Sequence, residues 1–356
     1  MPTRRSFLAT MLAAGTAPRL GWAAVGNPSH LAAARDADGG FAIYGLGAQG
    51  EMRFRVPLPA RGHAGAGHPR RAEAVAFARR PGTFALVLDC ATGDVLHRLT
   101  PPDGRQFNGH GVFAEGGRTL FTSEQASDTS EGLIGIWDVE AGYARTGEMS
   151  THGIGPHDLR LMPDGETLVV ANGGIATDPT DRRKLNIATM RPNLAYLSGT
   201  GRLRELVELA PELRQNSIRH LAVRADGLVG FAMQWEGVPG VAPPLLGLHR
   251  QGQAPVLAEA PLADELAMRG YAGSVAFTGA GDELAITSPR GGRLHRFSDQ
   301  GAFRGAVARD DICGLAPRPD GYLASDGLGG LIAIGPDGPA ALGRFDCAWD
   351  NHIVTL

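Results

Sequence analysis

The chain contains 356 residues, of which 43% are hydrophobic, 20% are charged and 51 are glycine. The apolar content excludes a disordered chain, and a glycine share about twice the usual value favours many tight turns and a large all-β fold. The 34 Lys and Arg residues nearly balance the 37 Asp and Glu residues and form no basic stripe, so nucleic acid is not an expected partner.

The N-terminus predicts an export signal. The Arg4-Arg5 pair precedes an apolar run from Leu8 to Gly15, and Trp22-Ala23-Ala24 is typical of a cleavage site. We interpret residues 1–23 as a twin-arginine signal, which is too short to span a membrane, and expect a periplasmic protein. No later segment is long and apolar enough to span a membrane. Residues 24–356 are predicted to form a single domain and a monomer.

An internal repeat organises the rest of the chain. A strand-turn-strand pattern begins at positions 63, 110, 157, 220, 274, 313 and 352. The average spacing is about 48 residues, which is typical of β-propeller blades. Two further strand-like runs follow each opening, so each unit supplies four short strands. The pattern therefore predicts an all-β, seven-bladed β-propeller.

The last repeat is truncated at Asn351–Leu356. Because an open array leaves strand edges unpaired, we expect this strand to complete a blade from the inside. The three outer strands of that blade are expected at Leu31–Arg35, Phe41–Leu46 and Glu51–Leu58. The segments Thr177–Arg191 and Glu236–Pro244 are predicted to be insertions above the blades.

One position of the repeat carries the strongest chemical signal. The residues that open the seven units are His63, His110, His157, His220, Ser274, Cys313 and His352. The first strand of each propeller blade lines the central channel, so these residues are expected at one height around it. Imidazole and thiolate are preferred ligands of zinc, copper and iron. We therefore predict that the five histidines and Cys313 bind a transition metal. A structural ring and an anionic or organic ligand are the alternatives.

Weaker candidates border this ring. We predict additional contacts to a ligand from Ser274, Glu124, Gln234, Arg80 and Asn172. Glu124 and Gln234 fall near the ends of second strands, while Arg80 and Asn172 lie in loop segments. Ser274 has no GxSxG motif around it, so nucleophilic hydrolysis lacks support.

The three cysteines are Cys90, Cys313 and Cys347. An odd number leaves at least one thiol unpaired, and a Cys313–Cys347 bridge stays open at this point.

Several segments together carry a family resemblance: Ala76–Gly82, Asn108–Phe113, Gly132–Asp138, Gly155–Leu159, Ala171–Ile175, Leu185–Asn186 and Trp349–His352. On these motifs the mature chain resembles the bacterial domain-of-unknown-function family numbered fifteen-thirteen. The resemblance implies twin-arginine export and a gene neighbourhood thought to serve iron uptake, shared with imelysin-like and di-haem peroxidase-like proteins. It makes iron the leading metal and those periplasmic proteins the candidate partners, with copper or zinc as alternatives.

Looser similarities define the competing functions. The chain is similar to nitrous oxide reductase, whose seven-bladed propeller holds a histidine-ligated copper cluster, but it has five ring histidines and no cupredoxin domain. Its similarity to six-phosphogluconolactonase-type propellers is confined to the fold. We expect a periplasmic metal-binding propeller that acts in iron acquisition or handling. A copper- or iron-dependent oxidoreductase, a lactonase-like enzyme and a protein-interaction scaffold for iron uptake are the alternatives.

Overall fold

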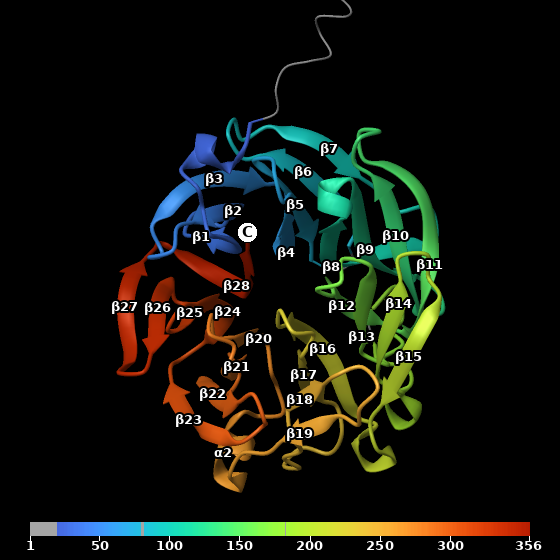
Figure 1. Cartoon of the computed structure of the whole chain (residues 1–356), viewed down its shortest axis with the longest axis vertical. Helices are drawn as coiled ribbons and strands as arrows, with labels where there is room; N and C mark the ends of the chain where they lie inside the picture. Colours follow the sequence, from blue (N-terminus) through green and yellow to red (C-terminus); the bar gives the residue numbers. More distant parts are fainter. Residues whose placement is uncertain (1–19, 80–81, 182) are drawn as a thin grey trace, which may run out of the picture.

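The computed structural model describes residues 20–79, 82–181 and 183–356. In this part of the chain, seven four-stranded antiparallel sheets radiate from a central axis as the blades of a propeller (Figure 1). The predicted all-β, seven-bladed architecture is confirmed. The Arg pair of the predicted signal and Arg80 lie outside the described residues.

The blades are numbered here in chain order, and their strands are given from the innermost outward. Blade 1 contains β28 (Cys347–Thr355), β1 (His30–Asp36), β2 (Phe41–Leu46) and β3 (Met52–Leu58). Blade 2 contains β4 (Gly62–Gly67), β5 (Glu73–Ala78), β6 (Ala85–Asp89) and β7 (Val95–Leu99). Blade 3 contains β8 (Arg105–Ala114), β9 (Thr119–Ala126), β10 (Glu131–Asp138) and β11 (Ala144–Ile154).

The remaining blades follow the same order. Blade 4 contains β12 (Pro156–Leu161), β13 (Thr167–Asn172), β14 (Asn193–Ser198) and β15 (Leu203–Glu208). Blade 5 contains β16 (Asn216–Val223), β17 (Val229–Trp235), β18 (Leu246–His249) and β19 (Val256–Ala258). Blade 6 contains β20 (Ser274–Phe277), β21 (Glu283–Ser288), β22 (Arg293–Ser298) and β23 (Phe303–Ala308). Blade 7 contains β24 (Ile312–Arg318), β25 (Gly321–Asp326), β26 (Gly330–Gly335) and β27 (Gly338–Arg344).

Within residues 20–79, 82–181 and 183–356, helical structure is confined to short connecting segments. These are the 3-10 turns η1 (Trp22–Val25), η2 (Glu115–Gly117), η3 (Ile187–Thr189) and η4 (Pro211–Leu213), and the α-helix α2 (Leu262–Ala267). Within the described residues, none of the helices is long and apolar enough to cross a membrane.

The two ends of the described chain meet in blade 1. β28 pairs antiparallel with β1, for example Leu31 opposite Val354, and becomes the innermost strand of that blade. Figure 1 shows this strand beside the centre of the ring, coloured red next to the blue strands β1 and β2. Closure by the C-terminal strand, as predicted, removes the edges that an open ring would expose.

Apolar side chains fill all seven spaces between neighbouring blades. Between blades 2 and 3, for example, Phe77, Phe107 and Trp137 form one buried cluster. Because the second strands are covered on both faces, they are buried almost continuously, as β13 and β25 are. The outermost strands alternate instead between exposed and partly buried positions, as β23 does. Sheet-on-sheet packing around the ring therefore holds the blades at fixed places about the axis.

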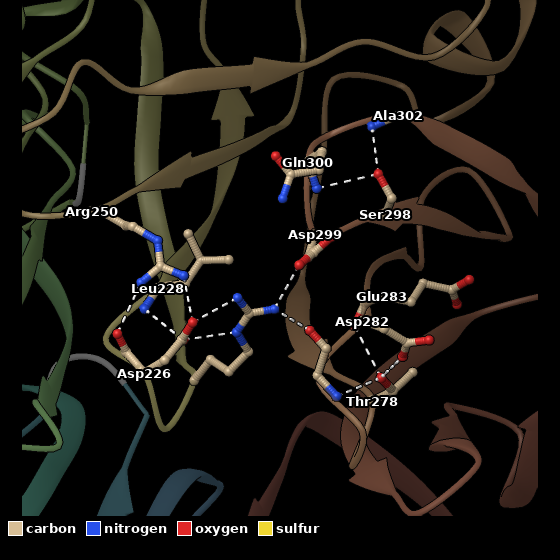
Figure 2. A network of polar contacts seen from close by, with 12 residues as sticks. Asp226, Leu228, Arg250, Thr278, Asp282, Glu283, Ser298, Asp299, Gln300 and Ala302 are labelled. Atoms are coloured by element: carbon tan, nitrogen blue, oxygen red, sulfur yellow. Dashed lines mark hydrogen bonds and ion pairs between the residues drawn. The ribbon is translucent and has the colours of Figure 1, made fainter.

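Charged side chains add contacts at the rim between blades 5 and 6 (Figure 2). Arg224, in the turn after β16, lies 2.8 Å from Asp226 and 2.9 Å from Asp299 of blade 6. Asp226 also accepts a hydrogen bond from Arg250. Because the Asp226 side chain is 48% exposed, solvent screens these pairs and their contribution to stability is small.

The two predicted insertions follow β13 and β17, the second strands of blades 4 and 5. Lys184 in the first forms an ion pair with Glu236 in the second. Second strands run antiparallel to inner strands, so both insertions leave the sheets at the end of the channel where the inner strands begin.

Closure of the ring gives a stability test. Ile353 of β28 is 6% exposed and packs in the cluster between blades 1 and 7. We expect Ile353→Ser to lower the free energy of unfolding by about 2–4 kcal/mol, because it removes buried apolar surface and leaves a cavity. Urea unfolding followed by circular dichroism measures this. Thr355→Ser, at an exposed position of the same strand, is the control, and equal stability of the two variants would contradict closure by β28.

Candidate metal centre in the channel

The inner strands bring the five ring histidines into mutual contact. The ring centroids of His63 and His352 are 4.6 Å apart, and those of His110 and His157 are 4.8 Å apart. His220 completes the cluster, at 4.7 Å from His157. These residues come from five different blades, so the channel gathers side chains that lie almost 300 residues apart in the sequence.

Four of these histidines form a group suited to one metal ion, which we call the four-histidine group. Its members are His63, His110, His157 and His352. One ring nitrogen from each lies within 4.8 Å of the others. Nitrogens bound to a common ion at about 2.1 Å lie at most about 4.2 Å apart, so only a small inward movement separates this arrangement from a ligand set.

Irregular strand pairing directs these side chains into the channel. Six inner strands carry a register shift at or beside the ring residue: β4 between Gly62 and Gly65, β8 between Phe107 and Gly111, β12 between Pro156 and Leu159, β16 between Ile218 and His220, β24 between Ile312 and Leu315, and β28 between Trp349 and Ile353. Such bulges insert extra residues into one strand and redirect side chains. In β20, by contrast, pairing is regular from Ser274 onward.

Close packing of the rings also requires a glycine. Gly109 precedes His110 and has a φ of +95°, a conformation that other residues rarely adopt. A Cβ atom at this position would lie 2.4 Å from Cδ2 of His63. Gly109 therefore allows two ligand candidates from neighbouring blades to approach each other.

Seven of the ten nitrogens of the five ring histidines are buried and lack protein partners. Within the described residues, the nitrogens without a hydrogen bond are Nδ1 of His63, Nε2 of His110, Nε2 of His352, and both ring nitrogens of His157 and His220. A buried polar atom without a partner is costly unless water or a ligand satisfies it. The cluster therefore has the free lone pairs that a metal ion requires.

Burial also keeps four of these imidazoles neutral. It lowers the pKa of His63 to about 4, against the opposing effect of Asp350. Burial, together with the positive charges of neighbouring groups, lowers the pKa values of His157, His220 and His352 well below the usual value. Neutral imidazole is the form that binds metals, so no proton has to leave at neutral pH.

Two aspartates, Asp158 and Asp350, each lie beside one of the ring histidines. Oδ1 of Asp158 lies 3.2 Å from Nδ1 of His110, and Oδ2 accepts a hydrogen bond from the backbone N–H of Leu221 at 3.0 Å. Burial alone would raise the pKa of Asp158, but the positive charge of Arg160 and the contact with His110 hold it below the usual value. An ionised Asp158 keeps the proton of His110 on Nδ1, which leaves Nε2 free to bind a metal.

Asp350 has a similar place beside His63. One carboxylate oxygen is 3.8 Å from Nδ1 of His63, and the other accepts a hydrogen bond from Arg61 at 2.7 Å. Burial opposes ionisation, but His63, Arg61 and Arg79 lower the pKa of Asp350 below its ordinary value.

Cys313 and Ser274 occupy ring positions but are not members of the four-histidine group. Sγ of Cys313 is directed at backbone oxygens, 3.5 Å from that of Asp350 and 3.6 Å from that of Trp349. Burial raises the pKa of Cys313 to about 12, so it is a thiol at neutral pH. Ser274 is buried at the start of β20.

The cysteines form no disulfide. Cys90, Cys313 and Cys347 are all free thiols. The Cys313–Cys347 bridge that the sequence left open is therefore not formed.

The additional candidates divide into two sets. Gln234 lines a cavity beside the ring, and its Nε2 donates to the backbone oxygen of Ala272. Glu124 lies inside blade 3, where it accepts hydrogen bonds from Thr122 and Arg145. Asn172 donates to the backbone oxygen of Thr151 and to Asn193. Neither Glu124 nor Asn172 lines this cavity.

The histidines lie between two cavities of different character. The first has a volume of about 170 Å³ and is lined by His63, Arg79, Asn108, His157, Arg219, His220, Gln234, Tyr271 and Asn351. The second has a volume of about 540 Å³ and is lined mainly by apolar residues that follow the ring positions along the inner strands, such as Leu221, Leu315 and Ile353. A small molecule in the first cavity would contact three ring histidines.

Comparison with known proteins places the chain in a family. Residues 56–356 match the family described as "Protein of unknown function (DUF1513)". The chain belongs to this family. The resemblance expected from the sequence motifs is thereby confirmed. No curated protein sequence matches the chain.

Solved structures resemble this DUF1513 protein in fold. One is named "Kuenenia stuttgartiensis Hydrazine Synthase", with a TM-score of 0.61, 15% sequence identity, and coverage of 93% of this chain and 98% of that chain. At this level of identity the likeness shows the fold alone.

Acid sensitivity follows from the depressed histidine pKa values. An unfolded histidine titrates near pH 6.5, whereas His63 in the fold titrates near pH 4, so protons bind preferentially to the unfolded chain between these values. We expect the metal-free protein to keep full stability above pH 6.5 and to lose at least about 2 kcal/mol on acidification to pH 4.5.

Urea unfolding at a series of pH values with a chelator present measures this loss. A His157→Asn/His220→Asn variant should show a shallower dependence, whereas His97→Gln, on the outermost strand of blade 2, should follow the parent protein. A parent profile that is flat from pH 7 to 4.5 would contradict the neutral state of the ring.

Proposed function

We propose that this DUF1513 protein binds a transition metal ion at the four-histidine group. The observation that supports this most strongly is the convergence of four buried imidazoles, from four blades, within 4.8 Å. Packing alone does not call for buried nitrogens without hydrogen bonds, and nitrogens of this kind are present on all four residues.

The donor set favours borderline ions. Imidazole suits zinc, copper, iron and nickel, and geometry alone does not choose among them. We propose iron, because the family resemblance noted in the sequence implies a gene neighbourhood thought to serve iron uptake. The proposal places the protein in the periplasm, after twin-arginine export, as a monomer that handles iron with imelysin-like or di-haem peroxidase-like partners.

His220 and the two aspartates support such a site from outside the group. His220 contacts His157 and His352, with centroid distances of 4.7 and 4.9 Å, and can replace one of them as a ligand. Asp158 fixes the tautomer of His110, and Asp350 lies beside His63. Carboxylates behind imidazole ligands are typical of metal sites in proteins.

A metal-dependent oxidoreductase is the second candidate. The polar cavity favours it, because a small substrate there would contact His157 and His220 directly. A visible absorption band that changes on addition of a reductant would support this candidate over metal handling alone.

Elemental analysis tests metal binding. Untagged protein purified from the periplasm should contain close to one equivalent of iron, or of copper or zinc, per chain. His110→Ala/His157→Ala should lose most of this metal, because it removes two of the four imidazoles. His97→Ala, which removes a half-buried histidine of β7, is the control and should keep it. Equal metal content in all three folded proteins would exclude the ring as the site.

The second test addresses Asp158. Asp158→Asn places an amide donor beside Nδ1 of His110, which favours the wrong tautomer for binding through Nε2. We expect the affinity for the metal to fall about 10- to 100-fold with little change in the melting temperature. Competition with a chelator measures this, and Asp337→Asn at an exposed turn is the control. Unchanged affinity in Asp158→Asn would show that the carboxylate does not orient the ligand.

A further inference from the structure

We propose that the 170 Å³ cavity beside the ring is a binding site for a small anion, a carboxylate or a tetrahedral oxyanion, held by Arg219 and Asn108. This inference goes beyond metal binding, because the side chains that carry it lie outside the four-histidine group and need no ion.

Arg219 is a cation without a counter-ion. It lines the cavity, and within the described residues it forms no ion pair and no hydrogen bond, while its Nε atom is buried without a partner. Burial lowers the pKa of Arg219, yet a guanidinium keeps its proton at neutral pH. The residue is only partly buried, but withdrawing part of a guanidinium, here its Nε, from water costs free energy that a bound group of opposite charge would offset.

The carboxylates near the ring do not supply that charge. Asp158 lies 3.1 Å from Arg160, and Asp350 lies 3.6 Å from Arg79 as well as close to Arg61. The carboxylate of Glu236, which attracts Arg219 from a distance, is itself paired with Lys184. The arginines around the channel therefore outnumber the carboxylates, and an anion would offset the excess.

Asn108 gives a second, independent indication. Its side chain is 1% exposed and lines the same cavity. Neither Nδ2 nor Oδ1 has a hydrogen-bond partner within the described part of the chain. A buried amide with both groups free is rare, and its N–H donors suit an anionic oxygen.

A bulge in β16 places the side chain of Arg219 at the cavity. In β16 the pairing shifts between Ile218, opposite Met233, and His220, opposite Ala232, so Arg219 is the extra residue of a bulge. Neighbouring residues on a regular strand face opposite sides, but the bulge lets Arg219 and His220 line one cavity.

The rest of the lining fits the same class of ligand. Oη of Tyr271 accepts a hydrogen bond from Nδ2 of Asn351 at 3.2 Å, so the phenol proton is free to donate. Gln234 lines the cavity as well. The volume equals that of about six water molecules, enough for phosphate or a short dicarboxylate but not for a large organic molecule.

Isothermal titration of the untagged full-length mature protein, freed of metal with a chelator, tests the site. The probes are inorganic phosphate, sulfate and malonate, and at least one should bind with a stoichiometry near one. Arg219→Gln should weaken that binding at least about tenfold, because it removes the charge and keeps a polar side chain. Asn108→Ala should weaken it about threefold or more.

Arg304→Gln, on the exposed side of β23, is the matched control and should bind as the parent does. Melting temperatures show whether each variant is folded. A preference for phosphate and sulfate over malonate identifies an oxyanion site, and the reverse preference identifies a carboxylate site. If none of the probes binds, or if the folded Arg219→Gln variant binds as tightly as the parent, the proposal is overturned.

The metal content of the same variants separates this proposal from the proposed function. Arg219→Gln should keep the metal while losing the anion, and His110→Ala/His352→Ala, at two ring positions that do not line the cavity, should lose the metal while still binding the anion in the folded protein. Metal content and anion binding are measured separately, so a negative result for one site does not decide the other.

Discussion

The chemistry of the channel depends on irregular pairing in the inner strands. An inner strand has to stay hydrogen-bonded to its neighbour, and regular pairing alternates side chains between the two faces of the sheet. The bulges in β4, β8, β12, β16 and β28 relax this rule where each histidine stands. Blade 6, which lacks such a shift at Ser274, contributes no residue to the four-histidine group.

The electrostatic arrangement around the ring follows from that geometry. Burial keeps imidazoles such as His63 and His157 uncharged, while arginines keep Asp158 and Asp350 ionised. The ring thus combines neutral donors with negative charges directly behind them, and Arg219 adds positive charge on the cavity side. A cation in the ring would lie beside the negative charges of Asp158 and Asp350, and an anion in the cavity would lie beside the positive charge of Arg219, so each proposed site has its own compensating charge.

The sequence predicted the fold because blade architecture is periodic. Turn residues and strand spacing recur about every 48 residues, and the truncated last repeat points to closure. The ring position could be found in the same way, since the histidines share one register. The bulges could not be found, because an extra residue in a hairpin leaves no compositional trace.

Because the bulges could not be predicted, the sequence analysis also missed two residues of the site. Asp158 and Arg219 are direct neighbours of ring histidines, and strict alternation would place them on the opposite face. Cys313 shows the converse limit. It shares the register and a bulge with the histidines, but its shorter side chain ends against the backbone oxygens of Trp349 and Asp350. A shared register predicts a location and not a contact.

The closing strand has a consequence for the order in which the protein acquires its centre. His352 is carried by β28, so the four-histidine group exists only after the last segment of the chain has docked beside β1. An ion bound to both His63 and His352 would tie the C-terminal strand to the blade that follows the seam. Such an ion would stabilise the closed ring by cross-linking these two blades. Its removal would destabilise the ring at blade 1, where the N-terminal and C-terminal strands pair.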